Sequence, residues 1–217
     1  MKAVIFDMDG VIFDSERAVF NGWKEIAEKY GFKDLEIPYM KCIGVNAAST
    51  RKIFLDFYGN DFPYDDYCRE QSANYHAKYD NGRLPLKPGV FELLDYLKKE
   101  GYCTAIASST RTAVVENQIR DAGLLKYFNL IVGGDQVAKS KPEPDIFLKA
   151  AEGLGSDFSD VYVVEDSYNG IRAAFKAGMK PIMIPDMLPA DDEMREKAAV
   201  VLDNLKAVID WLGQESR

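Results

Sequence analysis

The chain has 217 residues, a length that suits one sizeable hydrophobic core with a small appended unit. Hydrophobic residues make up 47% and charged residues 29%, which is typical of a soluble globular protein and excludes a largely disordered chain. The net charge of -8 leaves no basic stripe, so we expect no binding to nucleic acid and none to an anionic membrane surface.

Cysteine and histidine usage limits the redox and metal chemistry. The cysteines Cys42, Cys68 and Cys103 stand far apart and form no CxxC pair, which is typical of reduced thiols in the cytosol. His76 is the only histidine, so a zinc site is not expected. The N-terminal residues carry no charged leader before a long apolar run, and no stretch reaches the roughly 18 apolar residues of a membrane span. We therefore expect a cytoplasmic protein.

The first predicted element is a short apolar strand that ends in two carboxylates. Ala3 to Phe6 form the apolar run, Asp7 and Asp9 follow it, and Gly10 releases the chain. Taken alone, this pattern is explained equally well as an ordinary turn, because Asp and Gly are common turn formers.

A helical insertion is predicted after this strand. Three amphipathic stretches with aromatic residues follow, without a strand signal, at Val19–Tyr30, Ser49–Tyr58 and Tyr64–Tyr79. The chain then returns through a Pro- and Gly-containing segment at residues 84–89. We predict a small all-helical cap at residues 15–83 and a catalytic core formed by residues 1–14 and 84–217.

The rest of the chain alternates between strands and helices. Apolar runs at Cys103–Ala107, Leu130–Val132, Val161–Val164 and Pro181–Ile184 predict strands, and the segments Val90–Glu100, Ala113–Ala122, Ile146–Leu154 and Ile171–Ala177 have helical length and period. This order predicts an α/β fold, with a Rossmann-like parallel sheet covered by helices on both faces.

Polar residues follow several of the predicted strands, and ligands bind at that edge of a parallel sheet. Glu165 and Asp166 add carboxylates to Asp7 and Asp9, and such crowding of like charges favours a hard dication with oxygen ligands, such as Mg²⁺. Other residues there suit a phosphate. Donors are available from Ser108, Ser109 and Thr110 at a loop that enters a helix, and from the cationic Lys141. Individually, a helix cap or a solvated lysine explains these residues better.

Together the four segments resemble the four motifs of the haloacid dehalogenase superfamily: Asp7-Met8-Asp9-Gly10-Val11, Ala107-Ser108-Ser109, Lys141-Pro142-Glu143-Pro144-Asp145 and Glu165-Asp166-Ser167. The helical insertion resembles the cap of the branch that holds beta-phosphoglucomutases and sugar phosphatases. The resemblance implies that Asp7 is the nucleophile and Asp9 the general acid and base. It implies phosphate binding by Ser108, Ser109 and Lys141, and a magnesium site that uses Asp7, Asp9, Asp166 and Glu165. It also favours phosphoryl transfer over halide displacement, because dehalogenase members lack the aspartate that stands here as Asp9.

The resemblance leaves a phosphatase and a mutase to be distinguished. Where the mutase cap has a histidine, an arginine and a lysine, the matching positions here are Val19, Ala47 and Gln71. These replacements favour hydrolysis of a small sugar or polyol phosphate through an aspartyl-phosphate. A second phosphate site could still be rebuilt from other cap residues, namely Arg51, Arg69, His76 and Lys78.

Two further alternatives stay open. A phosphonatase would need a buried cap lysine for imine formation, for which the candidates are Lys24, Lys29, Lys41 and Lys52. A non-catalytic binding protein of the same fold is the remote alternative. The sequence gives no indication of the oligomeric state.

Overall fold

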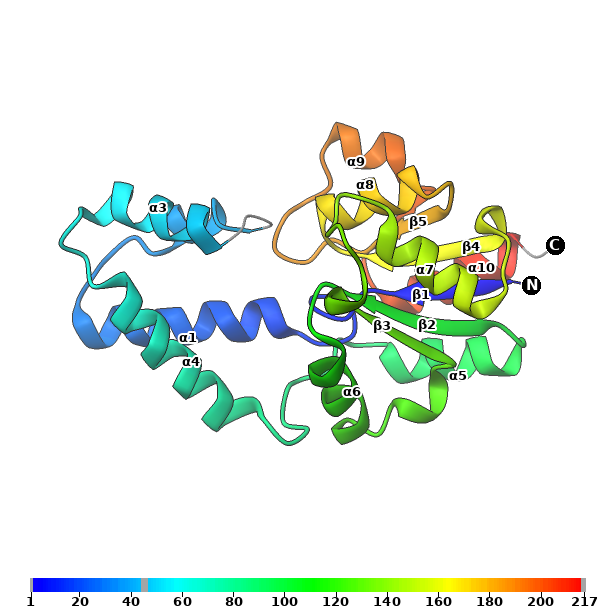
Figure 1. Ribbon diagram of the computed structural model, residues 1–217, viewed down its shortest axis with the longest axis horizontal. Coiled ribbons are helices and arrows are strands. Elements are labelled where there is room, and N and C mark those ends of the chain that lie inside the picture. The colour runs from blue at the N-terminus through cyan, green and yellow to red at the C-terminus, as the bar shows by residue number, and fades with distance from the viewer. Residues whose placement is uncertain (1, 44–46, 216–217) are drawn as a thin grey trace.

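The computed structural model describes residues 2–43 and 47–215. Its centre is a parallel sheet of six strands in the order β3-β2-β1-β4-β5-β6, which confirms the predicted fold class (Figure 1). The strands are β1 (Ala3–Phe6), β2 (Cys103–Ser108), β3 (Leu130–Gly133), β4 (Val161–Glu165), β5 (Lys180–Met183) and β6 (Val200–Val201). Chain order reverses direction across the sheet at β1 and β4, and such a switch point is where α/β sheets bind ligands.

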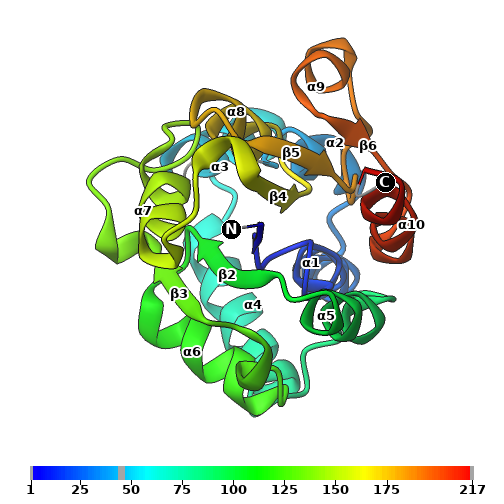
Figure 2. The same ribbon diagram turned by 90° about the vertical axis from the view of Figure 1, so that its right-hand side faces the viewer.

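Helices cover both faces of the sheet because each strand alternates its side chains between two apolar layers (Figure 2). Val4 and Phe6 pack with α5 (Val90–Lys99), α6 (Thr112–Asp121) and α10 (Leu205–Glu215) on one face. Ala3 and Ile5 pack with α7 (Asp145–Leu154) and α8 (Tyr168–Lys176) on the other.

Four helices follow the first strand and lie beyond one end of the sheet, opposite the two termini (Figure 1). They are α1 (Ser15–Tyr30), α2 (Glu36–Met40), α3 (Ala47–Tyr58) and α4 (Tyr64–Tyr79), and we call residues 15–83 the helical segment. Its apolar centre is aromatic: Trp23 and Tyr64 stack with ring centroids 6.0 Å apart, and Phe54 packs against both. No strand occurs among the described residues of this segment.

Two extended connections join the helical segment to the sheet, and they pair with each other. The amide of Asp14 donates to the carbonyl of Pro85 at 2.8 Å, the amide of Lys87 donates to the carbonyl of Ile12 at 2.9 Å, and an antiparallel bridge joins the residues between them. We call this paired region the neck. The division into a catalytic core and a cap at this point stays a prediction.

Sequence patterning located the predicted strands to within about one residue but missed several short elements and the C-terminal helix. The missed elements are α2, α9 (Asp192–Lys197), β6, α10 and the short 3-10 helices Leu125–Tyr127, Gly134–Gln136 and Phe158–Asp160. In the part of the chain that the structure describes, no helix is both long enough and apolar enough to cross a bilayer.

Candidate active site

The carboxyl ends of the central strands meet in one cavity of about 700 Å³. Asp7 follows β1, where its amide donates to the carbonyl of Val164 in β4 at 3.0 Å. This bond carries the β1–β4 pairing past the last strand residue and fixes the backbone at the switch point. All the residues predicted for the site line this cavity: Asp7, Asp9, Ser108, Ser109, Lys141, Glu165 and Asp166.

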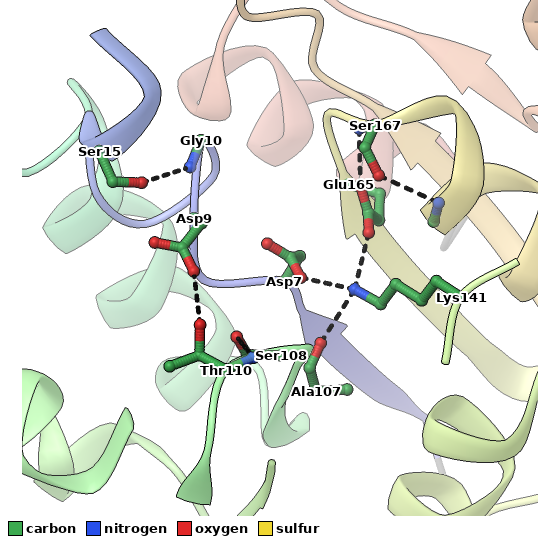
Figure 3. A network of polar contacts seen from close by, with 11 residues as sticks. Asp7, Asp9, Gly10, Ser15, Ala107, Ser108, Thr110, Lys141, Glu165 and Ser167 are labelled. Atoms are coloured by element: carbon green, nitrogen blue, oxygen red, sulfur yellow. Dashed lines mark hydrogen bonds and ion pairs between the residues drawn. The ribbon is translucent and has the colours of Figure 1, made fainter. Parts of the chain in front are cut away.

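Lys141 connects three strand ends from a loop far away in the sequence (Figure 3). Its ammonium Nζ donates to Asp7 Oδ1 at 2.5 Å, to Glu165 Oε1 at 2.8 Å and to the carbonyl of Ala107 at 3.1 Å. The three donors of the ammonium group are therefore all used. The Lys141 side chain is 6% exposed, so this cation is held in place and screened from bulk water.

Burial and charge act in opposite directions at this contact. Burial opposes the charge of Lys141, but Asp7 and Glu165 more than offset it, so the pKa of Lys141 is raised. The pKa of Asp7 is raised to about 7: burial is the largest cause, Lys141 lowers the pKa, and the carboxylates of Glu165 and Asp9 raise it. A single cation thus faces several buried carboxylates.

Asp9 lies two residues after Asp7, in the loop that follows β1, and its hydrogen-bond partners differ from those of Asp7. Thr110 donates a hydrogen bond from its hydroxyl to Asp9 Oδ2 at 3.1 Å (Figure 3). Burial raises the pKa of Asp9, while the hydrogen bonds from Ser15 and Thr110 and the charge of Lys141 lower it. A carboxyl group that burial helps to keep protonated can donate a proton to a leaving group.

Ser108 ends β2 and is 1% exposed, and its Oγ accepts a hydrogen bond from the amide of Thr110 at 3.1 Å. The neighbouring Ser109 lines the same cavity just before α6. Two serine residues at the end of β2 therefore line the space beside Asp7, and hydroxyl groups there suit an anion.

Asp166 approaches the Asp7–Asp9 loop closely, and Gly10 makes this approach possible. A Cβ on Gly10 would lie 2.3 Å from Asp166 Oδ2, and the φ of Gly10 is +76°. Both facts require glycine at this position. The pKa of Asp166 is raised well above its ordinary value, first by burial and then by the charges of Glu165 and Asp7.

The carboxylate cluster fits a divalent cation by its chemistry. Asp7, Asp9, Glu165 and Asp166 supply hard oxygen donors whose negative charge exceeds the single charge of Lys141. Within residues 2–43 and 47–215, however, no three acidic, histidine or cysteine side chains converge as a ready set of metal ligands. The use of these four side chains as metal ligands therefore stays a prediction.

Glu165 already has a partner on each carboxylate oxygen. Oε1 accepts from Lys141, and Oε2 accepts from the amide of Ser167 at 2.7 Å. Gly170 in α8 leaves room for this group, because an added Cβ would lie 1.7 Å from Oε1. In this arrangement Glu165 holds Lys141, and its predicted role as a metal ligand stays a prediction.

The remaining cavity lining was not predicted from the sequence. It comes from the helical segment, from the loop that carries Lys141, from the start of α8 and from the chain after β5, through Glu16, Ile43, Ser140, Ser167, Tyr168, Asn169, Arg172, Met187 and Leu188. A sequence signal existed for Glu16, which lies close after the Asp7–Asp9 motif, whereas Met187 and Leu188 carry no chemical signature.

The residues considered for a second phosphate site lie elsewhere. Val19, Ala47 and Gln71 do not line the cavity, and Gln71 is buried between α1 and α4, beside Gly22. Each cationic candidate of the helical segment pairs with an acidic side chain on the surface, in the pairs Arg51–Asp65, Arg69–Asp66, His76–Asp80 and Lys78–Glu25. Residues 44–46 of the predicted mutase-type loop lie outside the described residues.

Comparison with known proteins identifies the class. The family model of haloacid dehalogenase-like hydrolases matches residues 4–184, and the chain belongs to this family. Membership implies a divalent metal. The chain is 33% identical over 182 residues to a phosphorylated carbohydrates phosphatase of Thermotoga maritima, covering 84% of each chain.

A further relative places the chain in the branch that the motifs indicated, and a solved structure of the family shares its fold. The chain is 33% identical to the beta-phosphoglucomutase of Bacillus subtilis, covering 94% of each chain. A crystal structure of a haloacid dehalogenase family hydrolase from Deinococcus radiodurans, with bound phosphate and sodium, superposes with a TM-score of 0.84. Its sequence identity is 25%, over 99% of this chain and 96% of that one.

Proposed function

We propose that this protein is a magnesium-dependent phosphatase that hydrolyses a small phosphorylated sugar or polyol through an aspartyl-phosphate on Asp7. The observation that carries the proposal is the buried contact between Asp7 and Lys141 in a cavity that also holds Asp9 and Ser108. The relatives that act on phosphorylated carbohydrates support the substrate class.

In this mechanism Asp7 attacks phosphorus from the floor of the cavity, opposite the leaving oxygen. Lys141 holds the Asp7 carboxylate in place and supplies positive charge beside the transferring oxygens. Ser108 and Ser109 orient those oxygens from the β2 end. Asp7, Lys141 and Ser108 are held by hydrogen bonds before the substrate arrives, so little reorganisation is needed during the reaction.

Asp9 transfers the protons. In the first half of the reaction its protonated carboxyl group donates to the leaving alkoxide, and in the second half the resulting carboxylate takes a proton from the water that attacks the acyl phosphate. Thr110 keeps Asp9 Oδ2 oriented for this exchange. Asp7, Asp9 and Asp166 would hold the divalent metal, which would supply positive charge to offset that of the carboxylates and the phosphoryl oxygens.

The geometry of the helical segment favours hydrolysis over phosphate migration. A mutase must bind a second phosphate while its bisphosphate turns around, and cations of the helical segment would have to face the cavity. Arg51, Arg69 and Lys78 instead pair with carboxylates at the surface. Apart from Lys141, no lysine lines the cavity among the described residues, which also speaks against an imine-forming phosphonatase.

The test is product analysis. Release of phosphate from p-nitrophenyl phosphate in magnesium should establish catalysis, and its complete absence would favour a non-catalytic binding protein. A panel of sugar, polyol and nucleotide phosphates then identifies the substrate class. With beta-glucose 1-phosphate and a trace of the 1,6-bisphosphate, free phosphate should form faster than glucose 6-phosphate. The reverse order would identify a mutase.

A further inference from the structure

The part of the cavity that would face the leaving group carries few charged side chains. An in-line attack by Asp7 directs the leaving group away from the strand ends, towards the lining contributed by the helical segment, α8 and the chain after β5. Most of that lining is uncharged. Its charged members are Glu16, in the first turn of α1, and Arg172 in α8.

The charge of Arg172 is already compensated. Its Nε donates to Glu193 Oε1 at 2.8 Å, its Nη2 donates to Glu193 Oε2 at 2.5 Å, and its Nη1 donates to Asn169 Oδ1 at 3.2 Å. This two-pronged pair occupies the guanidinium edge that would otherwise grip a phosphate. Arg172 therefore contributes little attraction for an anionic leaving group.

The Glu16 carboxylate has no such partner. Its backbone carbonyl accepts from the Tyr39 hydroxyl, but within the described part of the chain its side chain makes no hydrogen bond and no ion pair. Burial raises the pKa of Glu16, and the next causes are the carboxylates of Asp9 and Asp186, not a cation. A half-buried acceptor on the leaving-group side is thus available to the substrate.

We propose that Glu16 determines specificity: its carboxylate accepts hydrogen bonds from leaving-group hydroxyls and repels a second phosphate, so the substrate is a hydroxylated monophosphate. This inference rests on the proposed phosphatase function. It adds a residue that selects between substrates of the same reaction, through attraction for hydroxyl donors and repulsion of like charge.

The experiment compares matched substrate pairs: fructose 6-phosphate with fructose 1,6-bisphosphate, and glucose 6-phosphate with glucose 1,6-bisphosphate, at fixed free magnesium. The wild type should prefer the monophosphate by about tenfold or more in kcat/KM, since like charge placed against like charge is strongly unfavourable. Glu16→Gln keeps the shape and an acceptor but removes the charge, so this preference should fall by about tenfold. Glu16→Ala should also raise KM for the monophosphate.

Glu28→Gln is the matched control, because Glu28 is exposed on the same helix and does not line the cavity. It should keep the wild-type preference, and thermal melts confirm that each variant is folded. If a pair is not hydrolysed, competitive inhibition of p-nitrophenyl phosphate hydrolysis gives the same ratio of affinities.

The inference is overturned if the wild type prefers the bisphosphates. It is also overturned if the preference of Glu16→Gln for the monophosphate stays within about twofold of the wild-type preference, because loss of a charge repulsion should change it by more than that. Failure of the proposed function looks different, since the wild type would then release no phosphate from p-nitrophenyl phosphate or from any other monophosphate.

Discussion

Gly170→Ala should damage the active site although Gly170 makes no contact with a substrate. The new Cβ would lie 1.7 Å from Glu165 Oε1 and 1.8 Å from its Cδ, so the Glu165 carboxylate must move. Glu165 is 1% exposed and both of its carboxylate oxygens accept hydrogen bonds, so any movement of this group breaks existing bonds. Its displacement would remove one of the carboxylates that hold Lys141 and would also release the amide of Ser167.

Two opposing effects set the change in the free energy of unfolding that Gly170→Ala causes. Alanine is favoured over glycine inside a helix by roughly 1 kcal/mol. Separating a buried carboxylate from its ammonium partner destabilises by roughly 3–5 kcal/mol. We therefore expect a net loss of about 2–4 kcal/mol in the free energy of unfolding, which for a chain of this size lowers Tm by roughly 5–15 °C. Lys141 would lose an anchor, and turnover should fall by about tenfold or more.

The assay is a thermal melt together with p-nitrophenyl phosphate turnover in saturating magnesium. Gly213→Ala is the matched control, because Gly213 also lies within a helix and its added Cβ would meet nothing closer than Tyr96 Oη at 3.8 Å. This control should be as stable as wild type or more stable, with full activity. If Gly170→Ala behaves like Gly213→Ala, Glu165 does not position Lys141 and the reasoning is wrong.

Three further predictions concern the carboxylates. Asp7→Asn should lower kcat by roughly a thousandfold or more with the fold intact, because the nucleophile is lost; turnover near the wild-type rate would sink the covalent mechanism. Asp166→Ala should sharply raise the magnesium concentration needed for half-maximal activity, and full wild-type activity after exhaustive chelation would contradict a metal requirement. In metal-free protein, Asp7 should make the free energy of unfolding fall as pH rises from about 4 to about 7. Its pKa is raised from 3.8 to about 7 in the folded state, so in this window the folded chain holds a proton that the unfolded chain has lost. Denaturant titrations of wild type and Asp7→Asn should differ by a slope of at most about 1.4 kcal/mol per pH unit, and equal slopes would exclude the shift.

The sheet and the reacting groups could be predicted because both depend on local signals. A buried parallel strand is an uninterrupted apolar run, and the residue that follows it lies at the ligand-binding edge whatever the rest of the fold does. Asp7, Ser108 and Glu165 were found in this way, and the structure brings them into one cavity with Lys141.

The partners of these groups could not be predicted, because they depend on how distant segments pack. Nothing in the sequence near Glu165 indicates that both of its oxygens are used, or that Gly170 leaves the space for it. The pairing of Arg172 with Glu193 joins two helices whose relative position follows from the tertiary fold. The strand β6 was missed because two residues carry too little periodicity to be recognised.

The neck has a consequence for how such proteins diversify. Because Asp14 and Pro85 are direct hydrogen-bonded neighbours, the chain leaves the sheet and comes back at nearly the same point. Whatever is inserted there adds little strain to the strands, since the closure of the loop is already secured at its base. New recognition surfaces can therefore be exchanged at this point while the spacing between Asp7 and Lys141, on which the chemistry depends, is left unchanged.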